Sequence, residues 1–170
     1  MPIWVPFAVS IAVGLLVGCF NGWVVSKLQV PAFLATLGSQ MIVYGINCLY
    51  FNKEPNNSQP LGGFRPEFTN IGTGTILGIP YLIIISIVVL IAVHILLTKT
   101  NLGKEIFAVG GNFEAAKVSG INVYKIQLFT YGIAGALYGL AGCIESIRTG
   151  SATSAYGNGY ELDAIASCIV

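Results

Sequence analysis

Four polar side chains recur along one apolar stretch of the sequence at the spacing of a single helical face. They are Thr36, Gln40, Tyr44 and Asn47. Intervals of three and four residues bring side chains to one side of a helix, so these hydroxyl and amide groups form one stripe. Polar groups in an apolar setting are costly unless they are paired or face water. Two interpretations stay open: the stripe lines the path of a polar solute such as a sugar, or it hydrogen-bonds to neighbouring helices.

A second polar stripe runs along the apolar stretch 126–146. Its Tyr131 and Tyr138 are further candidates for the lining of a solute path. Glu145 lies near the end of this stretch, three residues before Arg148. Since residues three apart are neighbours on a helix surface, we expect an ion pair between these two side chains.

The last apolar stretch begins with two carboxylates, Glu161 and Asp163, after a segment rich in glycine and serine. Acidic residues in a first helical turn stabilise the helix dipole. A helix that starts beside irregular backbone at membrane depth is also how transporters expose polar groups to solutes. Both interpretations stay open, and the sequence places these carboxylates, like Glu145, near an edge of the membrane.

The charged segment 99–125 carries the most informative local pattern. Asn112 is a favourable N-cap residue, Glu114 suits the positive end of a helix dipole, and Gly120 is a natural helix stop. These signals predict a short helix over 113–119. A helix held between two membrane spans implies that something docks on it, although a helix resting on lipid headgroups has the same signals.

Motifs for covalent chemistry are absent from the sequence. It contains no GxxxxGK[ST], HExxH, GxSxG or GxGxxG pattern, and its single histidine, His94, has no neighbouring set of metal ligands. We therefore expect no catalytic residue, no metal site, no cofactor and no nucleotide hydrolysis by this chain. A net charge of +1 without a cluster of Lys and Arg excludes a nucleic-acid partner.

The composition indicates that these residues lie on membrane-spanning helices. The 170 residues are 55% hydrophobic and only 9% charged, whereas soluble domains carry about 25% charged residues. A span needs about 20 mainly apolar residues. The sequence predicts an all-α polytopic membrane protein with four transmembrane helices, a truncated fifth segment and a short cytoplasmic helix. The four stretches are 5–25, 32–51, 79–98 and 126–146, and the fifth begins near Glu161.

Glycine rows mark two of the four stretches. They consist of Gly14, Gly18 and Gly22 in the first, and Gly132, Gly135, Gly139 and Gly142 in the fourth. Each row falls on one helical face. Because small residues let helices approach closely in lipid, we expect both helices to pack against protein. The alternative is that the glycine faces line a solute path or let helices slide. A further pair, Gly110 and Gly111, permits an unusual backbone before the short helix.

The distribution of basic residues favours one orientation. If 99–125 is cytoplasmic, alternation of the spans places five of the eight basic residues inside, close to helix ends, as the positive-inside rule requires. The inside then holds Lys27, Lys99, Lys104, Lys117 and Lys125, and the outside holds Lys53, Arg65 and Arg148. The sequence stops within an apolar run, so we expect residues 1–170 to be a partial permease domain that alone would not transport.

Three long segments resemble a known family. They are AVGGNFEAAKVSGINVYK at 108–125, FNGWVVSKLQVPAFLATLGSQMIVYGINCLYF at 20–51, and GSATSAYGNGYELDAIASCIV at 150–170. The chain resembles the ribose/galactose/xylose-type permeases of ABC importers, and within them the galactose/methylgalactoside import permeases. The resemblance covers nearly the whole chain except 52–77.

This resemblance implies a multi-pass permease subunit of the bacterial inner membrane that carries a monosaccharide across the lipid bilayer. Its implied partners are a cytoplasmic ABC ATPase subunit, an extracytoplasmic sugar-binding protein and a second permease copy. In the family, the GGNxEAA segment couples the permease to the ATPase. That role maps here onto Gly110, Gly111, Asn112, Glu114, Ala115, Ala116, Ser119 and Gly120. A secondary, ion-coupled transporter and a non-transport membrane subunit stay open as alternatives.

Overall fold

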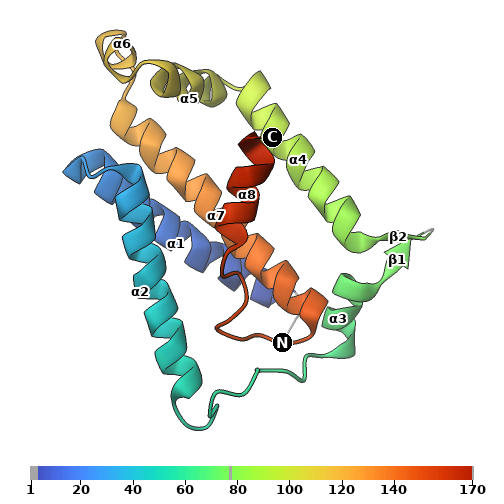
Figure 1. The fold of residues 1–170 in the computed structure, drawn as a ribbon. Helices are drawn as coiled ribbons and strands as arrows, with labels where there is room; N and C mark the ends of the chain where they lie inside the picture. Colours follow the sequence, from blue (N-terminus) through green and yellow to red (C-terminus); the bar gives the residue numbers. More distant parts are fainter. Residues whose placement is uncertain (1–3, 77, 170) are drawn as a thin grey trace.

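The computed structural model describes residues 4–76 and 78–169, and almost all of its regular structure is helical (Figure 1). The segments 1–3, Leu77 in the unaligned loop and Val170 at the end of the fifth segment lie outside the described residues. The helices are α1 Trp4–Leu28, α2 Ala32–Asn52, α3 Pro66–Thr73, α4 Tyr81–Lys99, α5 Asn101–Gly111, α6 Phe113–Val118, α7 Val123–Thr149 and α8 Tyr160–Ile169. The strands are β1 Thr75–Ile76 and β2 Ile79–Pro80.

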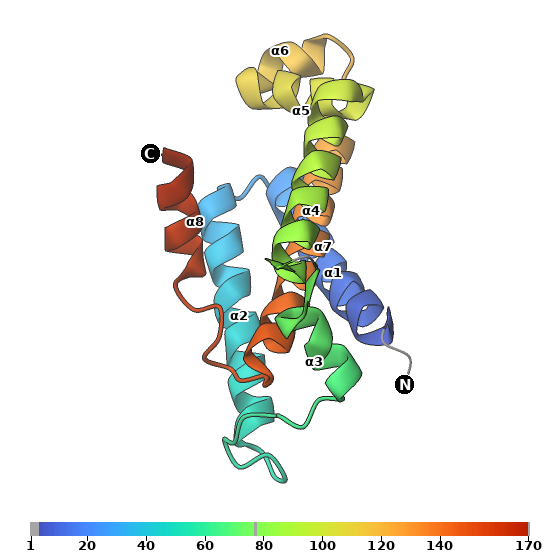
Figure 2. The same ribbon diagram turned by 90° about the vertical axis from the view of Figure 1, so that its right-hand side faces the viewer.

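Four of these helices are long and apolar enough to cross a membrane: α1, α2, α4 and α7. They run alternately between two ends of the molecule, as Figures 1 and 2 together show. The predicted four spans are therefore confirmed. The fourth span is longer than expected at both ends. The Asn122 side chain caps its start, and Gly150, with φ of 68°, ends it in the left-handed conformation that favours glycine.

The glycine rows bring α1 and α7 into direct backbone contact. A Cβ atom on Gly14 would overlap the carbonyl oxygen of Gly135 and lie 2.9 Å from the Cα of Gly139. A Cβ atom on Gly18 would likewise lie 2.9 Å from the Cα of Gly135. Because real Cβ atoms do not approach this closely, the interface requires glycine on both helices. The expected packing of these two helices against protein is confirmed, except at Gly142, which faces open space.

The other spans are far less covered by the chain itself. None of the residues of α4 is buried, and α2 meets α1 across a mainly apolar cavity of about 240 Å³. This cavity is lined by Leu16, Val17, Phe20, Ser39, Ile42 and Val43. Apolar helix surfaces of this extent are stable only against lipid or other membrane helices. The α1–α7 pair is thus the packed centre, and α2 and α4 lie on either side of it (Figure 1).

The described residues of the glycine- and proline-rich segment after α2 form only short regular elements, as expected. Strands β1 and β2 pair antiparallel with Thr75 opposite Pro80. Helix α3 packs on the C-terminal end of α7, where a Cβ atom on Gly72 would lie 2.7 Å from Cγ2 of Ile147. Ile147 is the most deeply buried side chain in the described part, at 1% exposure. This contact anchors the segment to the central helix pair.

A tight turn joins α4 to α5. The Thr100 hydroxyl accepts a hydrogen bond from the Gly103 amide at 3.1 Å and so caps α5. A Cβ atom on Gly103 would overlap the Leu97 carbonyl oxygen and lie 2.6 Å from the Leu97 Cα. Only glycine lets the first turn of α5 fold back so closely on the end of α4.

Gly103→Ala is expected to lower the free energy of unfolding by about 1–3 kcal/mol, because the added methyl group meets backbone that cannot move aside. Gly110→Ala is the matched control, since a Cβ atom there would meet nothing within 4 Å. The control should be unchanged or stabilised by up to about 1 kcal/mol, because alanine is the better helix former. Denaturant titration of the full-length protein in micelles measures both. If the two variants had equal free energies of unfolding, α5 would not approach α4 closely at Gly103.

Candidate functional site

The predicted short helix is present as α6, and a side chain caps its start. The Asn112 side-chain oxygen accepts a hydrogen bond from the Ala115 amide at 3.0 Å. Glu114 lies in the first turn and Lys117 in the last turn, and both charges favour the helix dipole. The local sequence therefore stabilises this helix although it is only 6 residues long.

The end of α6 is fixed by the backbone. The Gly120 amide donates to the Lys117 carbonyl at 3.1 Å, and the Ile121 amide donates to the Ala116 carbonyl at 3.1 Å. This pair of bonds is the Schellman motif, and it requires the left-handed conformation that Gly120 adopts with φ of 84°. Asn122 then caps α7 by accepting from the Lys125 amide at 3.1 Å. Helix α6 is thus held at both ends and is joined to α7 by a short turn.

Helix α6 presents most of its surface outward, at one end of the molecule (Figure 1). Seven of the eight residues predicted for coupling are exposed: Gly110, Gly111, Asn112, Glu114, Ala115, Ser119 and Gly120. The eighth, Ala116, is buried at 3% exposure and holds the helix against the rest of the chain. Beside them, Val118 is 87% exposed. The result is an accessible surface on a rigid support.

Helix α5 was not predicted from the sequence, and the unusual backbone expected at Gly110 and Gly111 is wrong. Both glycines complete the last turn of α5, and neither has a positive φ. The signal that identifies α5 is Thr100, whose hydroxyl caps its first turn. The segment 99–125 is therefore a pair of capped helices rather than a loop with one helix.

Asn112→Ala is expected to destabilise α6 by about 1 kcal/mol, because the Ala115 amide loses its side-chain acceptor. Hydrogen exchange at the Ala115 amide should then rise about fivefold, while exchange at the Lys125 amide stays unchanged. Asn122→Ala is the matched control, and it should give the reverse pattern because Asn122 caps α7. Unchanged protection at Ala115 in Asn112→Ala would mean that the cap does not stabilise α6.

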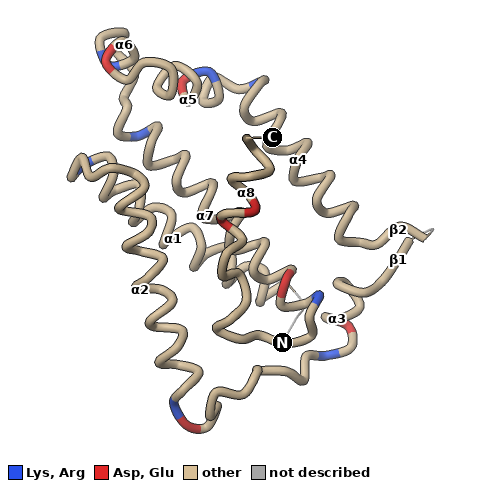
Figure 3. Tube along the Cα trace, in the orientation of Figure 1, with Lys and Arg blue, Asp and Glu red and all other residues tan. Residues whose placement is uncertain are grey.

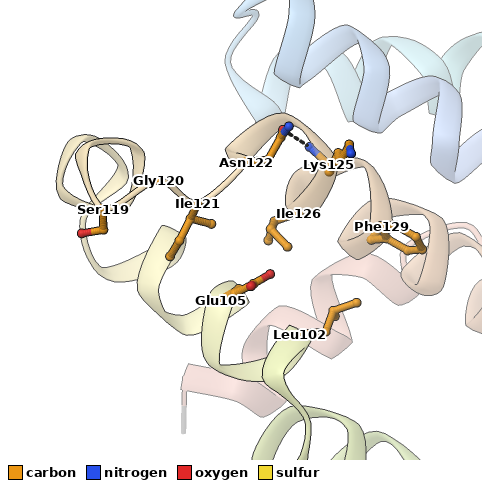
Figure 4. A pocket seen from close by; sticks show the side chains of 9 residues that line it. All are labelled: Leu102, Glu105, Ser119, Gly120, Ile121, Asn122, Lys125, Ile126 and Phe129. Carbon is orange, nitrogen blue, oxygen red and sulfur yellow. Dashed lines mark hydrogen bonds between the residues drawn. The ribbon is translucent and has the colours of Figure 1, made fainter.

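A cavity of about 460 Å³ lies where α5, the turn after α6 and the start of α7 meet (Figure 4). Its walls are mixed, with apolar side chains beside the charged Glu105 and Lys125. The lining consists of Leu102, Glu105, Ser119, Gly120, Ile121, Asn122, Lys125, Ile126 and Phe129. This space lies beside the turn that joins α6 to α7, next to the exposed surface of α6.

The polar face of α2 is directed toward α8. The Gln40 side-chain amide donates to the Glu161 carboxylate at 3.3 Å, and both side chains are exposed within this chain. Thr36 bonds back to the Ala32 carbonyl of its own helix at 2.9 Å. Since Tyr44 and Asn47 share the helical face of Gln40 and are exposed, one polar surface runs along this side of α2.

The start of α8 also contacts α7. The Tyr160 hydroxyl donates to the Glu145 carboxylate at 3.2 Å, and Arg148 donates to the same oxygen at 2.9 Å. The expected Glu145–Arg148 ion pair is confirmed. Glu161, which the sequence places near a membrane edge, is bonded to Gln40, eight residues after the start of α2. The sequence did not indicate that the connection from α7 to α8 folds back toward α2.

The two tyrosines predicted on α7 differ in environment. Tyr131 is half-buried at the α1 interface, with its Cβ atom 3.0 Å from where a Cβ atom on Gly22 would lie. Tyr138 is 74% exposed. The structure therefore gives Tyr131 a packing contact with α1, and it leaves Tyr138 available to a solute or to a neighbouring helix.

Comparison with known sequences identifies the family. Residues 1–170 match the family described as "Branched-chain amino acid transport system / permease component". The chain belongs to this permease family. Its four apolar helices and its capped helix pair thus form part of a multi-pass membrane transport protein.

Curated relatives of the permease are sugar importers by name. The chain is 41% identical over 174 residues to the galactose/methyl galactoside import permease protein of Escherichia coli, covering 100% of this chain and 51% of that protein. It is 39% identical over 173 residues to the ribose import permease protein of Haemophilus influenzae, covering 100% of this chain and 52% of that protein. The chain thus spans about half the length of these relatives. No solved structure shows a significant match.

Proposed function

We propose that this chain is part of the permease subunit of an ATP-driven ABC importer that carries a monosaccharide across the bacterial inner membrane. The similarity to import permeases for galactose/methyl galactoside and for ribose supports a monosaccharide as the solute. Galactose or a methyl galactoside is the first choice, because this relative has the higher identity. The permease itself does not hydrolyse ATP.

The observation that carries this proposal is the exposed, doubly capped α6. A partner that hydrolyses ATP in the cytoplasm needs a stiff element of the permease to act on. Helix α6 has a side-chain cap, a Schellman end and a buried Ala116 beneath it. Its turn leads directly into α7, and α7 packs on α1 through glycine. A displacement of α6 is therefore applied to the packed centre of the membrane domain.

The distribution of charged residues supports this assignment. Charged residues gather at the two ends, around α5 and α6 and around the connection between α2 and α3 (Figure 3). With α6 in the cytoplasm, Lys99, Lys104, Lys117 and Lys125 all lie on or beside the cytoplasmic helices. The partners we propose are an ABC ATPase on this side, a sugar-binding protein on the opposite side and a second permease copy.

Reconstitution of the complete permease with its ATPase and binding protein tests the proposal. Proteoliposomes should take up radiolabelled galactose only when ATP is present on the α6 side and the loaded binding protein is on the other. Collapse of proton and sodium gradients should leave the uptake unchanged. Uptake that needs an ion gradient and ignores ATP would overturn the proposal.

An ion-coupled transporter is the second candidate. The observation that favours it is Glu161, a carboxylate next to Gln40 along a membrane helix, because ion-coupling groups lie at such depths. The gradient experiment separates the two candidates, since only the ion-coupled transporter loses uptake when the gradients collapse.

A further inference from the structure

The contact between Gln40 and Glu161 lies inside the membrane layer. Helix α2 has 21 residues, which correspond to roughly 30 Å at 1.5 Å per residue. Gln40 is eight residues beyond Ala32, and so about 12 Å along the helix axis. Because the hydrocarbon layer is about 30 Å thick, Gln40 and its partner lie far from both surfaces. Figure 3 agrees, since the acidic positions of α8 lie between the two charged ends.

Helix α8 reaches this depth by an irregular return from the outer end of α7. Gly157 and Gly159 adopt positive φ values of 84° and 90° just before it starts. Consecutive residues then hold its first turn between two spans: Tyr160 bonds to Glu145 of α7, and Glu161 accepts from Gln40 of α2. The Glu161 carboxylate is therefore held opposite the Gln40 amide, although the two residues are 121 positions apart in sequence.

This pair cannot face lipid. Within the described residues, the recorded ion pair is Arg148–Glu145, so Glu161 has the neutral Gln40 as its side-chain partner. Both side chains are exposed in this chain. An exposed carboxylate in hydrocarbon is strongly unfavourable, and such groups face a water-filled cavity or polar protein. The exposed Tyr44 and Asn47 extend the same surface along α2.

We propose that Gln40 and Glu161 contact the transported monosaccharide and form a polar constriction of its path between α2 and α8. This inference rests on the proposed function and names the residues that perform its transport step. A carboxylate accepts hydrogen bonds from sugar hydroxyls, and an amide both donates and accepts. In the absence of sugar, the two side chains satisfy each other at 3.3 Å. A passing sugar exchanges this bond for bonds to its own hydroxyls, so the pair need not remain unsatisfied.

Uptake and ATP hydrolysis by the complete importer test the inference. Glu161→Gln and Gln40→Leu should each lower galactose uptake per assembled complex by about tenfold or more, as expected when a charged group loses its hydrogen bond. ATP hydrolysis stimulated by the loaded binding protein should remain. Glu67→Gln is the matched control, because it makes the same carboxylate-to-amide change at an exposed position of α3 that has no part in the proposed path, and its uptake should stay within about twofold of wild type.

A second measurement leaves the pair intact. In a cysteine-free form of the full-length permease, Tyr44→Cys should react with a water-soluble thiol reagent, and saturating galactose should slow the reaction. Ile46→Cys is the control, since Ile46 is also exposed and lies within one turn of Tyr44 but about 160° around the helix, and it should react slowly. Equal reactivity at the two positions, or no effect of galactose at position 44, would overturn the inference.

The uptake data also separate the possible failures. Normal uptake in both pair variants, or a loss that follows only the amount of assembled complex, would show that the pair is a structural clamp. The proposed function would stand in that case, because the wild-type importer still carries galactose with ATP. If the wild-type importer shows no ATP-driven uptake, the proposed function itself fails.

Discussion

Gly135→Val is expected to separate α1 from α7 and to lower the free energy of unfolding by about 3 kcal/mol. Even the first added carbon would overlap the Gly14 carbonyl oxygen and lie 2.8 Å from the Gly18 Cα. Both neighbours are backbone atoms, so no side-chain rotation relieves the overlap. The two helices have to move apart and lose the close contact that holds the centre of the molecule.

Gly142→Val provides the matched control on the same helix. A Cβ atom at Gly142 meets nothing within 4 Å, so the same substitution there should leave stability within about 0.5 kcal/mol of wild type. Titration of the full-length protein from mild detergent into a denaturing one, followed by circular dichroism, measures both variants. If Gly135→Val and Gly142→Val lower the free energy of unfolding equally, the α1–α7 backbone contact is not what stabilises the domain.

The features that the sequence predicts well are those encoded locally. Spans follow from apolar length, and the glycine rows on α1 and α7 predict close packing because the spacing alone places them on one face. The ends of α6 follow from Asn112 and Gly120, which act within four residues of their own positions. Each of these inferences needs no knowledge of what lies elsewhere in the chain.

Helix α5 shows where local reasoning fails. Its three glycines, Gly103, Gly110 and Gly111, are poor helix formers and so favour a loop. Gly103 is instead required by the close approach to Leu97, which is a tertiary constraint. Glycine in this segment can therefore indicate either a loop or a close contact between helices. Only the fold of the α4–α5 turn distinguishes the two.

The contact between α2 and α8 was beyond sequence reasoning for a different reason. Gln40 and Glu161 were each singled out by residue type, but nothing local brings positions 121 residues apart together. The decisive element is the irregular return before α8, whose positive-φ glycines lie outside any regular helix. Of the two interpretations that the sequence leaves open for Glu161, the bond to Gln40 favours the solute contact over a role confined to the helix dipole.

Helices α6, α7 and α8 are connected so that a displacement of the first can reach the last. Helix α6 ends at Gly120, and only a short turn separates it from the Asn122 cap of α7. The opposite end of α7 carries Glu145, which accepts from Tyr160 at the start of α8. A push on α6 that shifts α7 along its axis therefore reaches the residue next to Glu161. In the proposed importer, this is how the ATPase would open the contact between α2 and α8.

Glu114→Lys is expected to weaken binding of the ATPase to the full-length permease by about tenfold or more, while membrane insertion stays intact. Glu114 is exposed in the first turn of α6, so its carboxylate is available to a cationic group of a partner. Reversal of the charge places two cations together at that contact. Affinity capture of the ATPase at several salt concentrations measures the loss, which salt should partly relieve.

Glu67→Lys is the control that isolates docking from helix stability. Glu67 occupies the same second position of its helix, α3, and is also exposed, but it lies at the opposite end of the molecule (Figure 2). Both substitutions cost their helix about the same dipole energy, roughly 0.3–1 kcal/mol. Only Glu114→Lys should release the ATPase. Release by both variants would trace the effect to folding, and release by neither would remove α6 from the coupling interface.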